Sequence, residues 1–186
     1  MPLVSKRTRY AFHGLAFLSV YAQDRPLPLD AVMGYLRGYS GELTLSPGYI
    51  VKIFQQITRA GLTESVSGPR GGYRLARPAN TIRLIDIVEA LEGPSLTGCC
   101  LLSVGACADQ NACGVRDKIQ QAELAFHQVF AGETISSLAD GMNFSQVPDP
   151  RPGSKPGSPP ARGPAAGSKS RRLPASSGRD GREKQD

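Results

Sequence analysis

The sequence predicts a mainly α-helical protein with one small β-hairpin. Three observations predict this fold class. Apolar residues recur at helical spacing in several segments of the 186-residue chain. A serine, a proline and a glycine mark the beginning and the end of one of these segments. Two short runs of β-prone residues flank the glycine-rich stretch "SGPRGG", which is typical of a hairpin turn.

The first helix is predicted in "SKRTRYAFHGLAFLSVYA", with Ser5 as its N-cap. Its apolar positions have the spacing of an amphipathic helix: Tyr10, Ala11, Leu15, Leu18 and Tyr21. Lys6 and Arg7 lie in the first turn, where the helix dipole disfavours positive charge. This placement favours either a contact with phosphate or a solvated helix end.

A short second helix is predicted at residues 29–36, followed by a loop in "GYSGE". The third helix begins with Ser46 as N-cap and Pro47 at its first position, and Gly61 ends it. One face of this helix is apolar: Tyr49, Ile50, Ile53, Phe54 and Ile57. The residues off that face point outward: Gly48, Lys52, Gln55, Gln56 and Arg59.

The third helix is followed by the predicted hairpin, with strands in "LTESV" and "YRLA" and with Arg70 near its tip. Further helices are predicted at residues 84–91, 115–132 and 134–139. The helix at 115–132 is long and amphipathic, with apolar residues at Val115, Ile119, Ala122, Phe126, Val129 and Phe130.

Three helices followed by a hairpin is the layout of a winged helix-turn-helix domain. In this layout the third helix enters the major groove of DNA and the hairpin is the wing, whose glycines allow close approach to phosphate. The predicted DNA contacts are Lys6, Arg7, Ser46, Gly48, Tyr49, Lys52, Gln55, Gln56, Arg59, Arg70, Gly71 and Gly72. The alternative is a small helical domain with an incidental hairpin.

The net charge of +6 is unevenly distributed along the chain. Residues 1–83 carry +7, residues 84–146 carry −6 and residues 147–186 carry +5. A basic first half indicates a polyanion partner. The last segment holds eight of the 15 prolines and few large apolar residues, so it is predicted to be disordered.

These patterns divide the chain into four parts. Residues 1–92 are predicted to form the DNA-binding domain, and residues 93–113 a cysteine-rich loop. Residues 114–145 hold the long helix and a short C-terminal helix, and residues 146–186 form the basic tail. We expect a cytoplasmic protein with no membrane partner, because no signal peptide or membrane-spanning run is recognisable. The sequence has no catalytic constellation and no phosphate loop, so we expect no enzyme.

Three stretches carry a resemblance to a known family: "RYAFHGLAFL", "YIVKIFQQITRAGLTESVSGPRGGYRLARP" and "IRLIDIVEALEG" with cysteines after it. Over about residues 3–142 the chain resembles the IscR/NsrR/RirA-type family of bacterial winged-helix transcription regulators. The resemblance implies a homodimer, paired through the helix at 115–132, that binds a palindromic double-stranded DNA operator. It also implies control by an iron–sulfur cluster of two or four irons. The stretch "VMGYLRGYSGELTLSP" is longer than the usual turn of the family.

All four cysteines lie in "LTGCCLLSVGACADQNAC". Iron–sulfur clusters are held by thiolates, and the gaps between Cys99, Cys107 and Cys113 resemble the three-cysteine pattern of the family. Cys100 is the alternate to Cys99 as the first ligand. The alternatives are zinc binding, thiol–disulfide sensing without metal, plain buried cysteines, and an iron–sulfur carrier or assembly protein.

The fourth cluster ligand is not evident from the sequence. Some family members place a histidine three residues after the last cysteine, where this chain has Arg116. Others use an acidic residue of the N-terminal helix, but the first ten residues contain no Asp or Glu. His13 and His127 each lie on or beside an apolar helix face, which favours a structural role. An open or solvent-filled fourth position is the hypothesis.

Overall fold

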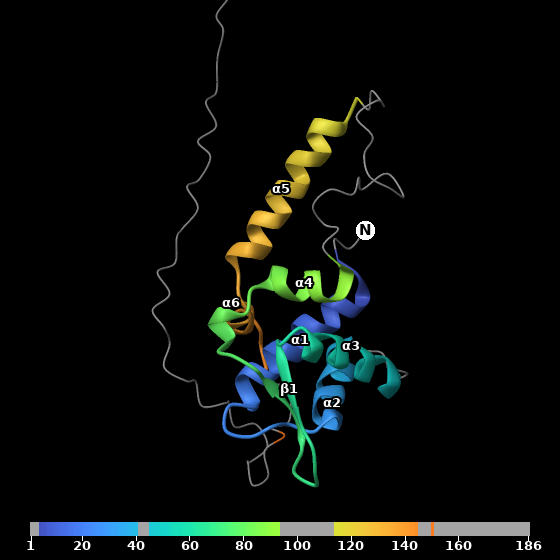
Figure 1. Ribbon diagram of the computed structural model, residues 1–186, viewed down its shortest axis with the longest axis vertical. Coiled ribbons are helices and arrows are strands. Elements are labelled where there is room, and N and C mark those ends of the chain that lie inside the picture. The colour runs from blue at the N-terminus through green and yellow to red at the C-terminus, as the bar shows by residue number, and fades with distance from the viewer. Residues whose placement is uncertain (1–3, 41–44, 94–113, 145–149, 151–186) are drawn as a thin grey trace, which may run out of the picture.

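The computed structural model describes residues 4–40, 45–93, 114–144 and 150. The order of the elements is α1 (Lys6–Tyr21), α2 (Leu29–Ser40), α3 (Pro47–Arg59), β1 (Thr63–Val66), β2 (Gly72–Leu75), the short 3-10 helix η1 (Ala79–Thr81), α4 (Leu84–Glu92), α5 (Arg116–Gly132) and α6 (Ile135–Asp140). Figure 1 shows α1 to α4, α6 and the hairpin gathered into one body, from which α5 extends. The predicted mainly helical fold with a single hairpin wing is confirmed for these residues.

Helix α1 is the central helix of this body. Ser5 is its N-cap, as predicted, because the Ser5 side chain accepts a hydrogen bond from the backbone N–H of Thr8. All five predicted apolar positions of α1 are buried, and the buried surface extends further around the helix than the pattern predicts, to Phe12, Ala16 and Phe17. The reason is that α1 packs against α2, α3, α4, α6 and β2. Gly14 permits the close approach of α1 to α3, because a Cβ atom at Gly14 would lie 3.0 Å from the ring of Phe54 on α3.

Helices α2 and α3 form the predicted helix-turn-helix pair. Helix α2 continues to Ser40, four residues beyond the predicted end, so the prediction of a loop from residue 38 was wrong. The guanidinium of Arg37 donates to the carbonyl oxygen of Leu45 at 3.4 Å, and the ring of Tyr39 lies 3.6 Å from that of His13. These contacts stabilise the additional turn.

Helix α3 ends at Arg59, and Gly61, the glycine that the sequence indicates, follows its C-cap Ala60. Gly61 has φ +70°, a conformation that glycine adopts without strain. The N–H of Gly61 donates to the carbonyl oxygen of Thr58, and the N–H of Leu62 donates to that of Ile57, each at 3.0 Å. This pair of hydrogen bonds is the Schellman motif, which directs the chain into β1.

Strands β1 and β2 form an antiparallel hairpin that pairs Thr63 with Leu75 and Val66 with Gly72. Leu27, just before α2, adds a bridge to Tyr73 through two backbone hydrogen bonds of 2.8 and 2.9 Å. The ring of Tyr73 also packs edge-on against Phe54 of α3, with centroids 4.9 Å apart. The hairpin is therefore fixed to α3 and to the segment that precedes α2.

Helix α5 differs from the other α-helices because none of its residues is buried within the described chain. Its C-terminal end is attached to the body by hydrogen bonds of 2.9 Å from Leu84 N–H to the carbonyl of Glu133 and from Ile135 N–H to the carbonyl of Ile82. Near this end, the ring of Phe130 contacts Phe12 of α1. Among the helices of the described residues, none has the length and the hydropathy of a membrane-spanning segment.

Candidate nucleic-acid interface

One face of α3 is buried and the opposite face is open to solvent. Ile50, Ile53, Phe54 and Ile57 are buried, as the apolar pattern predicts. Most of the predicted DNA contacts of this region are exposed, with Gln56 half-buried: Ser46, Gly48, Lys52, Gln55 and Arg59. Ser46 is the N-cap by position, although its side chain makes no capping hydrogen bond. The outward face of α3 is thus a polar and basic strip along a rigid helix.

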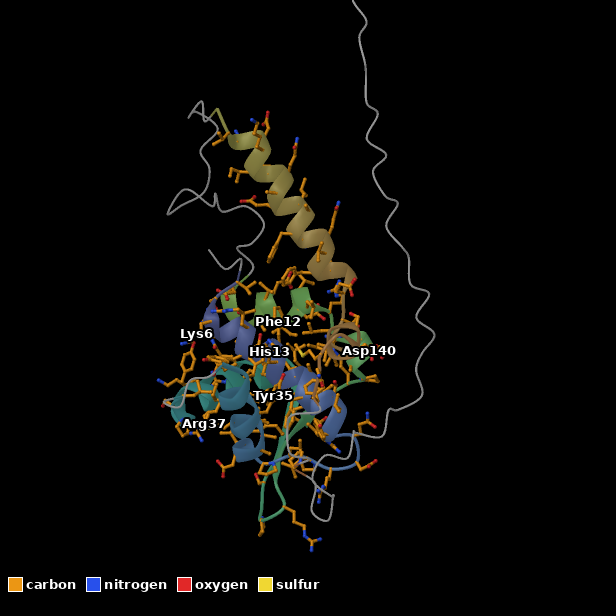
Figure 2. All side chains as sticks on the ribbon, turned by 180° about the vertical axis from the view of Figure 1, so that it is seen from behind. Lys6, Phe12, His13, Tyr35, Arg37 and Asp140 are labelled. Atoms are coloured by element: carbon orange, nitrogen blue, oxygen red, sulfur yellow. The ribbon has the colours of Figure 1, made fainter. Side chains whose placement is uncertain are left out.

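Tyr49 was assigned to both the apolar face and the DNA contacts, and the structure places it between them. Its side chain is 38% exposed, so its assignment to the buried face was wrong. The ring lies edge-on to the buried ring of Tyr10 on α1, with centroids 6.2 Å apart. The Nζ atom of Lys6 lies 5.9 Å from the centroid of the same Tyr10 ring. Tyr10 therefore brings the basic end of α1 beside the start of α3 (Lys6 is labelled in Figure 2).

Arg7 was predicted as a DNA contact, but its guanidinium lies against the end of α4. It donates to the backbone carbonyl oxygen of Leu91, and its Nη2 atom is 3.9 Å from Oε2 of Glu92. Arg7 thus has partners within the protein, unlike the exposed side chain of Arg70 at the wing, for which the described residues show no ion pair.

The two wing glycines are explained by contacts within the protein. A Cβ atom on Gly71 would lie 2.2 Å from the carbonyl oxygen of Val66. Gly72 has φ +149°, and a Cβ atom there would lie 2.0 Å from the carbonyl oxygen of Leu27. These glycines are therefore required by the fold of the wing, and their approach to phosphate stays a prediction.

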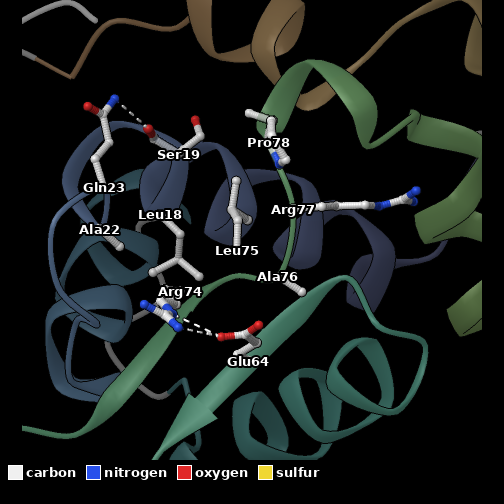
Figure 3. A pocket seen from close by; sticks show the side chains of 11 residues that line it. Leu18, Ser19, Ala22, Gln23, Glu64, Arg74, Leu75, Ala76, Arg77 and Pro78 are labelled. Atoms are coloured by element: carbon white, nitrogen blue, oxygen red, sulfur yellow. Dashed lines mark hydrogen bonds and ion pairs between the residues drawn. The ribbon is translucent and has the colours of Figure 1, made fainter.

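A pocket of about 430 Å³ lies beside the hairpin, between the end of α1 and β2 (Figure 3). Two arginines line it, and each has an acidic partner. Arg74 pairs with Glu64 at 2.8 Å, and Arg77 pairs with Asp86 at 2.8 Å. The pocket therefore offers little uncompensated positive charge to an anionic ligand, and we do not assign it to the interface.

The predicted cluster ligands Cys99, Cys107 and Cys113, and the alternate Cys100, lie outside the described residues. Among residues 4–40, 45–93 and 114–144, no group of three His, Cys, Asp or Glu side chains could hold a metal ion. His13 lies among aromatic side chains, with Nδ1 3.1 Å from the hydroxyl of Tyr35 (Figure 2). Burial, with a smaller effect of Arg9, lowers the pKa of His13 to about 4.

Sequence reasoning missed two residues beside this interface, Thr8 and Glu92. Thr8 is fully buried, and its hydroxyl donates to Oε1 of Glu92 at 2.5 Å. Burial alone raises the pKa of the Glu92 carboxyl, but hydrogen bonds from Ser5 and Thr8 and the charge of Arg7 outweigh it, and the net pKa is lowered. A threonine within an otherwise apolar face of a predicted helix was the available signal.

The fold and this surface define a winged helix-turn-helix DNA-binding protein. A family model described as Rrf2, iron-dependent transcriptional regulator, matches residues 4–141, and the chain belongs to the Rrf2 family. The resemblance found in the sequence is confirmed, and the protein is a transcription regulator rather than an enzyme.

A curated relative, protein aau3 of Rhizobium meliloti (strain 1021), is 32% identical over 136 residues, which cover 73% of this chain and 83% of that protein. The fold is similar to that of CymR, described as the global cysteine regulator of B. subtilis. That structure has a TM-score of 0.61 and 23% identity, and the match covers 77% of this chain and 100% of that chain. T. potens IscR has a TM-score of 0.59 and 21% identity, with coverage of 78% and 91%.

Proposed function

We propose that the protein is a homodimeric regulator whose binding to a palindromic operator is controlled by an iron–sulfur cluster on Cys99, Cys107 and Cys113, with Cys100 as the alternate ligand. The observation that carries the proposal is the position of the four cysteines. They lie between α4, which packs in the DNA-binding body, and α5, which extends from it. The description of the family as iron-dependent supports the same proposal.

The donor set fits an iron–sulfur cluster on chemical grounds. Thiolates are the ligands that such clusters take, and four cysteines within 15 positions provide them. When bound, the cluster supplies a redox- and nitric-oxide-sensitive group of two or four irons. The protein chain connects the residues that hold the cluster to the DNA-binding surface.

The DNA contacts in this proposal come from three elements. The exposed face of α3 lies in the major groove, with Lys52, Gln55 and Arg59 nearest the bases and phosphates. Lys6 at the start of α1 and Arg70 at the wing contact the backbone on either side. The basic tail at residues 146–186, which lies outside the described residues, adds affinity that does not depend on sequence. A DNA partner implies a cytoplasmic protein.

The dimer in this proposal is built on α5. Val115, Ile119, Ala122, Phe126 and Val129 follow one another at alternating steps of four and three residues, the spacing of a coiled-coil seam. None of the α5 residues is buried within the described chain, so a second copy has an apolar stripe to cover. Two copies would place two α3 helices on a palindrome, as helix-turn-helix dimers require.

The test is anaerobic purification of the wild type and Cys107→Ala, followed by visible absorption, iron, sulfide and zinc analysis, and operator binding. We expect the wild type to show iron–sulfur absorption and Cys107→Ala to lose it, together with the cluster-dependent part of operator affinity, while remaining a folded dimer. Zinc in place of iron would indicate a zinc-binding regulator. A metal-free protein whose operator affinity follows thiol oxidation would indicate thiol–disulfide sensing. Iron–sulfur absorption without any sequence-specific DNA binding would instead indicate a cluster carrier.

A further inference from the structure

The start of α1 and the end of α4 are joined by one carboxylate. Oε1 of Glu92 accepts hydrogen bonds from the backbone N–H of Ser5 at 3.2 Å and from the hydroxyl of Thr8 at 2.5 Å. The guanidinium of Arg7 adds an ion pair at 3.9 Å to Oε2 and a hydrogen bond to the carbonyl oxygen of Leu91. We call these contacts among Ser5, Arg7, Thr8, Leu91 and Glu92 the α1–α4 clasp.

The clasp gives each helix the end charge that its own sequence lacks. Helix α1 has no acidic residue in its first turn, and α4 has no basic residue in its last turn. Glu92 places a negative charge at the N-terminus of α1, and Arg7 places a positive charge at the C-terminus of α4. Each charge is favourable at the end of the other helix, but Arg7 also lies in the first turn of α1 and Glu92 in the last turn of α4, where the dipole of their own helix disfavours them. The clasp therefore depends on its hydrogen bonds and its ion pair rather than on the helix dipoles. Because hydrogen bonds to an ionised carboxylate are stronger than neutral ones, the clasp fixes the two ends relative to each other.

One side of the clasp leads to the DNA-binding surface. Lys6 lies between Ser5 and Arg7 in the sequence, so its backbone is held by the same contacts. About one turn of α1 further on, Tyr10 meets Tyr49 at the beginning of α3. A shift of the first turns of α1 would therefore move both the Lys6 ammonium and a contact that orients α3.

The other side of the clasp leads to the cysteines. Glu92 is the last residue of α4, and Gly93 follows with φ +89°, a conformation that favours glycine. The first cysteine is seven positions after Glu92 in the sequence. A conformational change at the cysteines is thus only a few residues along the chain from the carboxylate that holds α1.

We infer that Glu92 is a positioning residue for DNA binding, which holds the first turns of α1 through Ser5 and Thr8 and conveys to them the state of the cysteine-bearing segment. The inference rests on the proposed function for the second of these roles. Glu92 contacts neither the bases nor the metal ligands in this account. Arg7 contributes through the clasp rather than through a phosphate.

The variants that test the inference are Thr8→Val and Glu92→Gln. Thr8→Val removes the hydroxyl with little change of shape, and Thr8→Ser is its matched control because it keeps the hydroxyl. Glu92→Gln removes the charge, and Glu89→Gln is the matched control on an exposed position of the same helix. The probe is a DNA duplex selected from a random library by the wild-type protein, and the full chain is used throughout.

Two measurements separate the inference from the proposed function. The first is amide hydrogen exchange of residues 5–10, together with duplex affinity, in metal-free protein. We expect Thr8→Val and Glu92→Gln to speed exchange and to weaken duplex binding by about fivefold or more. The second is the ratio of duplex affinities with and without the cluster, which we expect these variants to bring toward one while cluster absorption is kept. Thr8→Ser and Glu89→Gln should match the wild type in both measurements.

The possible outcomes are distinct. If Thr8→Val and Glu92→Gln keep the wild-type exchange rates and duplex affinity, Glu92 is not a positioning residue. If they change both but leave the affinity ratio at the wild-type value, the role in conveying the state of the cysteines is overturned. If the wild type itself takes up no cluster, or binds the duplex equally with and without it, the proposed function fails, whereas the first measurement still decides whether the clasp positions α1.

Discussion

The ring of Tyr10 on α1 meets the ring of Tyr49 on α3 edge-on, with centroids 6.2 Å apart and planes at 82°. Tyr10 is buried and Tyr49 is partly exposed, so the contact joins a core residue to a surface residue. Lys6 lies above the same Tyr10 ring. Through these contacts the first turns of α1 are joined to the start of α3, the helix that we propose to lie in the major groove.

Lys6→Gln should weaken binding to specific and non-specific DNA by similar factors, because a phosphate contact carries no sequence information. The slope of log affinity against log salt should fall by about one unit. Fluorescence anisotropy over a salt series measures both quantities. Lys118→Gln, at an exposed position of α5, is the control and should leave the slope unchanged. An unaltered slope in Lys6→Gln would remove Lys6 from the interface.

Gly72→Ala should destabilise the protein by more than about 1 kcal/mol, because φ +149° strains an alanine and its Cβ would overlap the Leu27 carbonyl. Gly34→Ala is the matched control. Gly34 lies in α2 with open space around it, so alanine there should stabilise the protein by about 0.5–1 kcal/mol. Urea unfolding followed by circular dichroism measures both changes. Equal stabilities of Gly72→Ala and wild type would show that the wing tolerates a side chain beside Leu27.

His13 should make the folded state sensitive to mild acid. Its pKa is lowered from 6.5 to about 4 by burial, so between these values the unfolded chain binds more protons than the folded one. Stability should therefore fall as the pH decreases from about 6.5 to about 4. His13→Phe, which cannot be protonated, should show a smaller fall over this window in urea unfolding at a series of pH values. Parallel pH profiles of the two proteins would contradict the prediction.

Val129→Arg should weaken the dimer without unfolding the monomer. Val129 lies on the apolar stripe of α5 and is 57% exposed in the single chain, so a charge there is tolerated in the monomer but meets the partner copy in the proposed dimer. Leu124→Arg is the control, because Leu124 is equally exposed at 60% but lies off the stripe. Sedimentation equilibrium should give a raised dissociation constant for Val129→Arg and an unchanged one for Leu124→Arg. A raised dissociation constant for Leu124→Arg and an unchanged one for Val129→Arg would place the dimer seam on another face of α5.

Local signals in the sequence were sufficient for most of the fold. Ser46, Pro47 and Gly61 predicted both ends of α3, because capping depends on a few neighbouring residues. The extent of burial of α1 was not predictable in this way. Its burial depends on five elements that pack around it, several of them far away in the sequence.

The candidate site was only partly predictable for the same reason. The outward face of α3 follows from helical periodicity, which needs one helix alone. The hydrogen bond from Thr8 to Glu92 joins residues 84 positions apart, so no local pattern indicates it. The partner of Arg7 at the end of α4 could not be seen from its own segment either, and the contact of Arg7 with DNA stays a prediction.

In the proposed function, operator binding depends on a cluster held by the cysteines. The most direct test is the affinity of anaerobically purified protein for its selected operator before and after the cluster is removed by chelation, at one fixed salt concentration. We expect the affinity to change by about tenfold or more between the two forms, with non-specific DNA binding unchanged. The same operator affinity in both forms, with the cluster present by absorption in the first, would contradict it.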